Sequence, residues 1–114
     1  MLHVSSFPQL VQFIRAFQGK ALFIKAGAEW CGPCKRIQPY FSQLAEFYET
    51  TYAGQVAFLT YDHDEANQIS THFQVQSLPT FLCLLETDCP RLNGANPQQL
   101  DNWIKMCLQS IVLE

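Results

Sequence analysis

The stretch Trp30-Cys31-Gly32-Pro33-Cys34-Lys35 is the most informative part of this 114-residue sequence. It follows residues 21–26, a short run that is apolar except for Lys25. A short apolar run bounded by turn residues is typical of a central parallel strand that is covered on both faces. The stretch also begins a helical pattern that extends to about residue 52. The two cysteines therefore lie where a buried strand meets the start of a helix.

The rest of the sequence alternates between strands and helices. We expect strands at residues 2–4, 21–26, 56–61, 80–85 and 89–92, and helices at residues 6–17, 33–52, 64–73 and 97–111. This order, β-α-β-α-β-α-β-β-α, predicts an α/β fold with a mixed central sheet of about five strands sandwiched by helices. No linker or repeat divides the sequence, so we expect a single domain over residues 1–114.

Local signals support several of these boundaries. Ser6 and Gln9 form a capping-box pattern at the start of the first helix. Asp64 is expected to cap the third helix, and Asn96 precedes a proline at the first position of the last. The second helix contains Pro39, which should kink it. Its buried stripe is expected to comprise Ile37, Tyr40, Phe41, Leu44, Ala45 and Tyr48.

Composition and charge exclude several classes of protein. Hydrophobic residues make up 48% of the sequence and charged residues 15%, a balance that excludes intrinsic disorder. The net charge is −3 and there is no basic stripe, so neither nucleic acid nor an anionic membrane is expected as a partner. No apolar run is long enough to span a bilayer.

The five cysteines do not form a disulfide framework of the secreted type, because their number is odd and their spacing uneven. A Cys-x-x-Cys pair is also half of a zinc site, but no second close pair exists, and we expect no metal in the monomer. The turn Asp62-His63-Asp64 is interpreted as a solvated turn. Cys83 and Cys107 are expected to be buried and inert, and Cys89 to be exposed.

These motifs resemble the thioredoxin family over nearly the whole chain. The Trp-Cys-Gly-Pro-Cys segment is accompanied by Pro39 at the family's helix kink. Leu78-Pro79-Thr80 is similar to the family's cis-proline loop, and Asn93-Gly94 to its last turn. The resemblance implies the thioredoxin fold. It also implies a protein-disulfide reductase that serves electron transport and redox homeostasis.

Helix geometry and the resemblance together suggest roles for the cysteines. At a helix N-terminus the thiolate of Cys31 is stabilised, so Cys31 is expected to be the nucleophile. Cys34, one turn further on, is expected to resolve the mixed disulfide. The resemblance implies no bound cofactor, disulfide-containing clients, and recycling by a reductase that takes electrons from NADPH. It implies substrate contacts at Trp30, Gly32, Pro33, Leu78, Pro79, Gly94 and Ala95.

Lys25 is the main departure from the family. Thioredoxins carry a buried aspartate six residues before the first cysteine, and it helps to move the proton of the second. A lysine at this place cannot supply a carboxylate base. Either Lys25 extends to the rim and only fills space, or it reaches the cysteine pair and modulates its pKa. We favour the second interpretation and expect impaired turnover.

A different class of function stays open. The chain would then be a chaperone-like protein that binds unfolded clients on the apolar rim formed by Trp30, Leu78 and Ala95. Cys31 and Cys34 would serve as a redox sensor or as ligands of an iron–sulfur cluster, which requires a second chain because two thiolates cannot complete it. No signal peptide is recognised, so a reducing intracellular compartment is expected. The cytoplasm is the default, and the mitochondrial matrix applies if a transit segment was removed.

Overall fold

A five-stranded sheet in the order β1-β3-β2-β4-β5 forms the centre of the protein. It is seen in a computed structural model that describes residues 1–112. The strands are β1 (Leu2–Val4), β2 (Ala21–Gly27), β3 (Val56–Asp62), β4 (Thr80–Leu84) and β5 (Arg91–Asn93). The helices are α1 (Phe7–Ala16), α2 (Gly32–Thr51), α3 (Asn67–His72) and α4 (Pro97–Val112). The predicted order of elements is confirmed.

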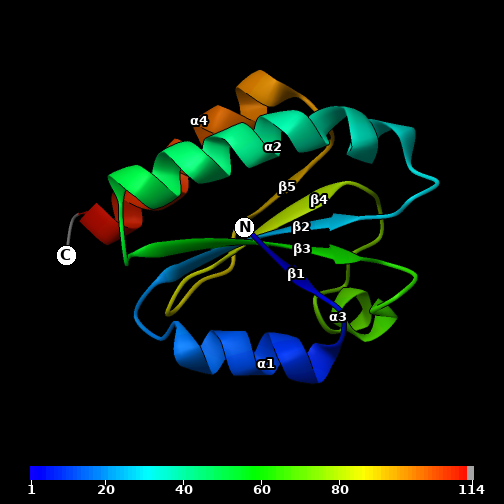
Figure 1. Cartoon of the computed structure of the whole chain (residues 1–114), viewed down its shortest axis with the longest axis horizontal. Helices are drawn as coiled ribbons and strands as arrows, with labels where there is room; N and C mark the ends of the chain where they lie inside the picture. Colours follow the sequence, from blue (N-terminus) through cyan, green and yellow to red (C-terminus); the bar gives the residue numbers. More distant parts are fainter. Residues whose placement is uncertain (113–114) are drawn as a thin grey trace.

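Two layers of helices cover the sheet. Helices α2 and α4 lie on one face, and α1 and α3 lie on the other (Figure 1). Successive side chains of β2 point to opposite faces of the sheet, so β2 contributes to the hydrophobic core on each face. Phe23 packs beneath α2 and α4, and Ile24 belongs to the cluster on the opposite face. All seven residues of β2 are buried, as expected for a strand covered on both faces.

Strand β2 has two different neighbours. It pairs in parallel with β3 and antiparallel with β4, so the expectation of a parallel environment holds on one side only. The register places Lys25 beside Thr60 on β3 and Phe81 on β4, and Thr60 beside His3 on β1. This row is polar at the β1 side and apolar at the β4 side, and it crosses the sheet near the carboxyl end of β2.

Three sequence predictions need correction. Helix α3 begins at Asn67 with Ala66 as its N-cap and no side-chain cap, because Asp64 is engaged elsewhere. Tyr40 is exposed and does not belong to the buried stripe of α2. At the start of α1 the Ser6 hydroxyl accepts from Gln9 N as expected, but the Gln9 side chain accepts from the backbone N–H of Ser5. The capping box is therefore displaced by one residue.

The loops that follow α3 and β5 have the backbone conformations that the sequence predicts. The Leu78–Pro79 peptide bond is cis, and Gly94 adopts φ +98, a left-handed conformation that favours glycine. Asn96 caps α4 by accepting from Gln99 N at 3.0 Å. Cys89 and Pro90 precede β5, which is shorter than the strand expected at residues 89–92. No helix among residues 1–112 is both long and apolar enough to cross a membrane.

Candidate functional site

A disulfide between Cys31 and Cys34 lies at the N-terminus of α2. Their Cα atoms are 5.3 Å apart. Cys31 is the N-cap of the helix, and its Sγ accepts a hydrogen bond from the backbone N–H of Cys34 at 3.2 Å. The unpaired N–H groups and the dipole of a 20-residue helix favour negative charge at this position. The geometry can therefore stabilise a thiolate on Cys31 when the bond is reduced.

The two cysteine residues differ little in exposure in this oxidised state. Cys31 is 5% exposed and Cys34 is 2% exposed. They form a buried cluster with Ala28, and Leu78 of the cis-proline loop packs against this cluster. Gly94 N donates to the carbonyl oxygen of Pro79 at 3.1 Å, which joins the turn after β5 to the same loop. The fold thus gathers the predicted residues from three separate parts of the chain.

The expected substrate residues are not equally accessible. Gly32 and Pro33 are exposed at the first turn of α2, and Gly94 is exposed in its turn. Leu78 and Ala95 are partly buried, and Pro79 is buried. Ala95 packs against the core beneath α2 and α4, and no contact of Ala95 with the disulfide is recorded among residues 1–112.

Trp30 stands out from the surface beside the disulfide. It is 69% exposed, and its Nε1–H donates to Asp64 Oδ2 at 2.7 Å. The indole is therefore tied to the loop after β3 and presents a large apolar surface to solvent. Asp64 was expected to cap α3, and its contact with Trp30 was missed because it joins two loops that lie 34 residues apart in the sequence.

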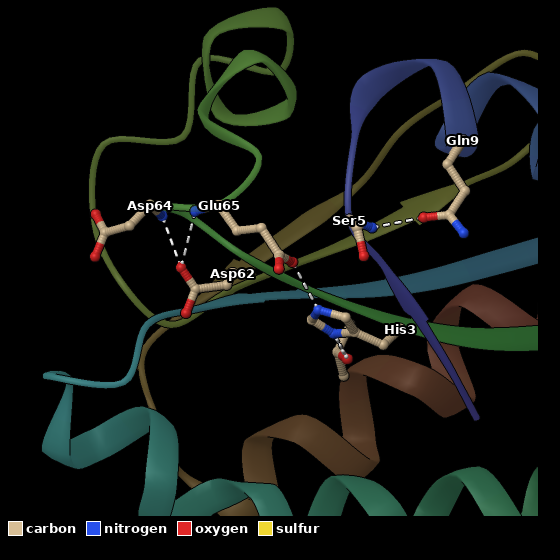
Figure 2. A network of polar contacts seen from close by, with 7 residues as sticks. His3, Ser5, Gln9, Asp62, Asp64 and Glu65 are labelled. Atoms are coloured by element: carbon tan, nitrogen blue, oxygen red, sulfur yellow. Dashed lines mark hydrogen bonds and ion pairs between the residues drawn. The ribbon is translucent and has the colours of Figure 1, made fainter.

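Asp62 organises the loop that holds Asp64. Its Oδ1 accepts from the backbone N–H of Asp64 at 2.8 Å and of Glu65 at 3.1 Å. His3 on β1 contacts Glu65 Oε1 through Nε2 at 2.9 Å, and its Nδ1 lies 3.2 Å from Thr60 Oγ1. Figure 2 shows Glu65 connecting His3 on β1 with Asp62 at the end of β3. The network fixes the loop that anchors Trp30.

Lys25 lies inside the protein next to the cysteine pair. It is 7% exposed, and its Nζ donates to Gln38 Oε1 on α2 at 2.6 Å. A Cβ atom placed on Gly27 would lie 3.4 Å from Lys25 Nζ and 3.8 Å from Cys34 Sγ, so both groups border the same point. Burial lowers the pKa of Lys25 from its usual 10.5. The side chain does not extend to the rim.

A hollow of about 250 Å³, open to solvent, borders this lysine. Its wall includes Lys25, Gln38 and Cys34, together with Thr60 from the neighbouring strand. Gln38 was missed by sequence reasoning. It lies four residues after Cys34, one helical turn further along the face that covers β2, and that spacing was the available signal.

The other cysteines lie away from this site. Cys83 and Cys107 are buried in the core beneath α2 and α4 as predicted, while Cys89 is half-buried rather than exposed. A hydrogen bond to Cys107, together with burial, raises the pKa of the Cys83 thiol. Among residues 1–112 no group of three or more histidine, cysteine or acidic side chains is arranged to hold a metal ion.

Comparisons of the sequence and of the structure with known proteins all point to one family. The family model described as Thioredoxin matches residues 2–106. Thioredoxin from Gallus gallus is 33% identical over 93 residues, covering 81% of this chain and 84% of that protein. Thioredoxin H-type from Populus jackii is 35% identical over 94 residues, covering 82% of this chain and 64% of that protein. The structure of Fasciola hepatica thioredoxin superposes with a TM-score of 0.84 at 26% identity, over 93% of this chain and 98% of that one.

Proposed function

The chain belongs to the thioredoxin family, and from that premise we propose that it reduces protein disulfides through Cys31 and Cys34, with turnover limited by Lys25. Family membership and the Cys31–Cys34 pair support thiol–disulfide oxidoreductase chemistry in general. The position of that pair at the N-terminus of α2 is the observation that carries the proposal.

In the proposed reaction the Cys31 thiolate attacks one sulfur of a substrate disulfide. A bond forms between Cys31 and that sulfur, and the other substrate sulfur leaves as a thiolate. Cys34 then attacks the Cys31 sulfur, closes the intramolecular disulfide and releases the second substrate thiolate. The substrate gains two electrons and the cysteine pair loses two. A reductase supplied by NADPH returns them, as the family implies.

Substrate binding is assigned to the surface around the disulfide. Trp30 offers an exposed indole on one side, and Gly32 and Pro33 expose the first turn of α2. Leu78 packs against the cluster that contains the cysteine pair, so an extended substrate strand could pair with its backbone there. Recycling by a dithiol donor favours a reducing intracellular compartment.

Lys25 is the reason to expect slow turnover. As an ammonium group it cannot accept the proton that Cys34 must lose before it attacks the mixed disulfide. Its positive charge also stabilises a thiolate. A stabilised thiolate is a weaker nucleophile, and its stabilisation shifts the redox equilibrium towards the reduced protein. The pair is therefore expected to be a less powerful reductant than a thioredoxin with a carboxylate at this position.

Insulin reduction tests the proposal. We expect measurable reduction by the unmodified protein, none by Cys31→Ser, and at least about tenfold faster turnover by Lys25→Asp because it restores a general base. Lys20→Asp is the matched control, since Lys20 lies just before the opposite end of β2 and should leave turnover unchanged. Reduction by Cys31→Ser at the unmodified rate would refute the role of Cys31. Unchanged turnover in Lys25→Asp would refute the role of Lys25.

The exposed Trp30 favours a second candidate function, the binding of unfolded polypeptides. If this function dominates, the protein suppresses the aggregation of a heated client equally well before and after Cys31→Ser, and it does not reduce insulin. Reductase activity without client protection would exclude it.

A further inference from the structure

We propose that Gln38, hydrogen-bonded to Ser42, is a positioning residue that holds the Lys25 ammonium group beside Cys34 and thereby shifts the cysteine pair towards its reduced form. The inference deepens the proposed function and rests on it. It concerns a hydrogen-bonded chain that leads from the surface of α2 to the buried end of Lys25.

The contacts form a continuous sequence. Lys25 Nζ donates to Gln38 Oε1 at 2.6 Å, and Gln38 Nε2 donates to Ser42 Oγ at 3.0 Å. Gln38 and Ser42 are four residues apart on α2, so their side chains meet on one face of the helix. The Gln38 side chain thus spans the distance from the helix surface to the buried lysine.

The orientation of the Gln38 amide follows from these partners. Ser42 Oγ accepts from the nitrogen, so the oxygen points to Lys25. The reversed amide would direct its N–H₂ group at an ammonium group, which has no lone pair to offer. The Lys25 ammonium group therefore selects this orientation of the amide, and Ser42 Oγ holds it in place by accepting from Nε2.

A neutral acceptor holds the lysine without cancelling its charge. Among residues 1–112 no carboxylate forms an ion pair with Lys25. Gly27 has no side chain at the point that lies 3.4 Å from Lys25 Nζ and 3.8 Å from Cys34 Sγ. The field of the ammonium group therefore acts on the Cys34 sulfur across a short gap.

Other titratable side chains line the same hollow as Lys25. They come from β1, from the loop before α2, from α2 itself and from the end of β3. These titratable side chains are His3, Glu29, Lys35, Tyr61 and Asp62. Lys25 differs from these in having its ammonium nitrogen within 3.4 Å of the point that borders Cys34.

The position of Lys25 should affect the thiol–disulfide equilibrium between this protein and glutathione. Two molecules of glutathione reduce the Cys31–Cys34 disulfide to a dithiol and become one glutathione disulfide. Because the ammonium group stabilises negative charge on Cys34, it favours the reduced protein in this equilibrium. Removing the group that holds the ammonium in place should shift the equilibrium towards the protein disulfide.

The experiment measures the equilibrium constant of the full chain against glutathione at fixed pH. We expect Gln38→Leu to shift it about threefold to tenfold towards the disulfide, the size expected for one partly screened charge. Ser42→Ala should give a smaller shift in the same direction, and it serves if Gln38→Leu does not fold. Gln43→Leu is the matched control, because Gln43 is exposed on the same helix and should change nothing.

A double-mutant comparison separates positioning from a general structural effect. In a Lys25→Met background, Gln38→Leu should have no further effect on the equilibrium, since the charge that it positions is gone. A shift that persists there, or equal constants for Gln38→Leu and the unmodified protein, would overturn the inference. The glutathione equilibrium needs no protein substrate, so failure to reduce insulin would refute the proposed function without deciding the role of Gln38.

Discussion

Replacing Lys25 with methionine removes a positive charge that the fold buries next to Cys34, and we expect the variant to be more stable than the unmodified protein. Lys25 is 7% exposed and forms no ion pair with a carboxylate among residues 1–112. Its Nζ donates a hydrogen bond to Gln38 Oε1, a neutral acceptor. Methionine has a similar length, so it fills the same space without a charge to desolvate.

The magnitude follows from two opposed effects. Relief of the buried charge stabilises the variant by several kcal/mol in principle, but a lysine beside an open hollow retains part of its hydration. The lost hydrogen bond leaves Gln38 Oε1 to be satisfied by water, which costs about 1 kcal/mol. We expect a net gain of about 1–2 kcal/mol at neutral pH. Each kcal/mol corresponds to about 4 °C in Tm for a chain of 114 residues.

The pH dependence gives the sharper test. Because burial lowers the pKa of Lys25 below 10.5, the folded protein binds this proton less tightly than the unfolded chain. The cost of keeping the lysine is therefore fully present at pH values below its folded pKa and disappears as the pH rises towards 10.5. The stability difference between Lys25→Met and the unmodified protein should shrink over that range.

Urea unfolding of the oxidised proteins at several pH values measures this difference, with Lys20→Met as the control. A Lys25→Met variant that is less stable at neutral pH would refute the claim that an uncompensated charge is buried. A stability difference that grows as the pH rises would refute it as well, since the sign of the linkage would be reversed.

Three further variants test other parts of the structure. Tyr48→Phe removes the hydrogen bond from Tyr48 OH to Asp101 at 2.7 Å and should lower the free energy of unfolding in urea by about 1 kcal/mol. Because burial and Asp101 raise the Tyr48 pKa above 10.0, this loss should become smaller only above pH 10. A loss that becomes smaller at lower pH would contradict the assignment. Asp64→Ala should free Trp30, lowering the anisotropy of its fluorescence while changing stability by less than about 1 kcal/mol, and an unchanged anisotropy would show that the contact does not hold the indole. Leu82→Ala removes a fully buried side chain and should cost about 2–5 kcal/mol in urea unfolding, so a loss below about 1 kcal/mol would contradict its place in the core.

Much of the fold could be predicted because its signals are local. The apolar run before Trp30 and the helical spacing after Cys34 place β2 and α2 within one or two residues of their observed bounds. Asn96 before a proline identifies the start of α4, since a side-chain cap acts within a few residues. The cis bond before Pro79 was expected from the family resemblance rather than from local physics.

The contacts around the site were harder to predict because they join distant segments. Asp64 has the position of a helix cap in the sequence, and only the approach of Trp30 from another loop shows that it binds the indole instead. Gln38 is an ordinary polar residue on a helix until α2 packs on the sheet and brings it to Lys25. Capping rules operate along the chain, whereas these hydrogen bonds depend on how the layers come together.

Trapping the mixed disulfide tests most directly whether Cys31 at the N-terminus of α2 is the attacking thiolate. Reduced Cys34→Ser and Cys31→Ser variants are mixed with a disulfide-containing peptide, and the covalent adducts are measured by mass spectrometry. Cys34→Ser should accumulate the adduct through Cys31, because no second sulfur is left to resolve it. Cys31→Ser should accumulate little, since Cys34 is 2% exposed in the oxidised structure. Equal adducts in both variants, or none in Cys34→Ser, would contradict the account.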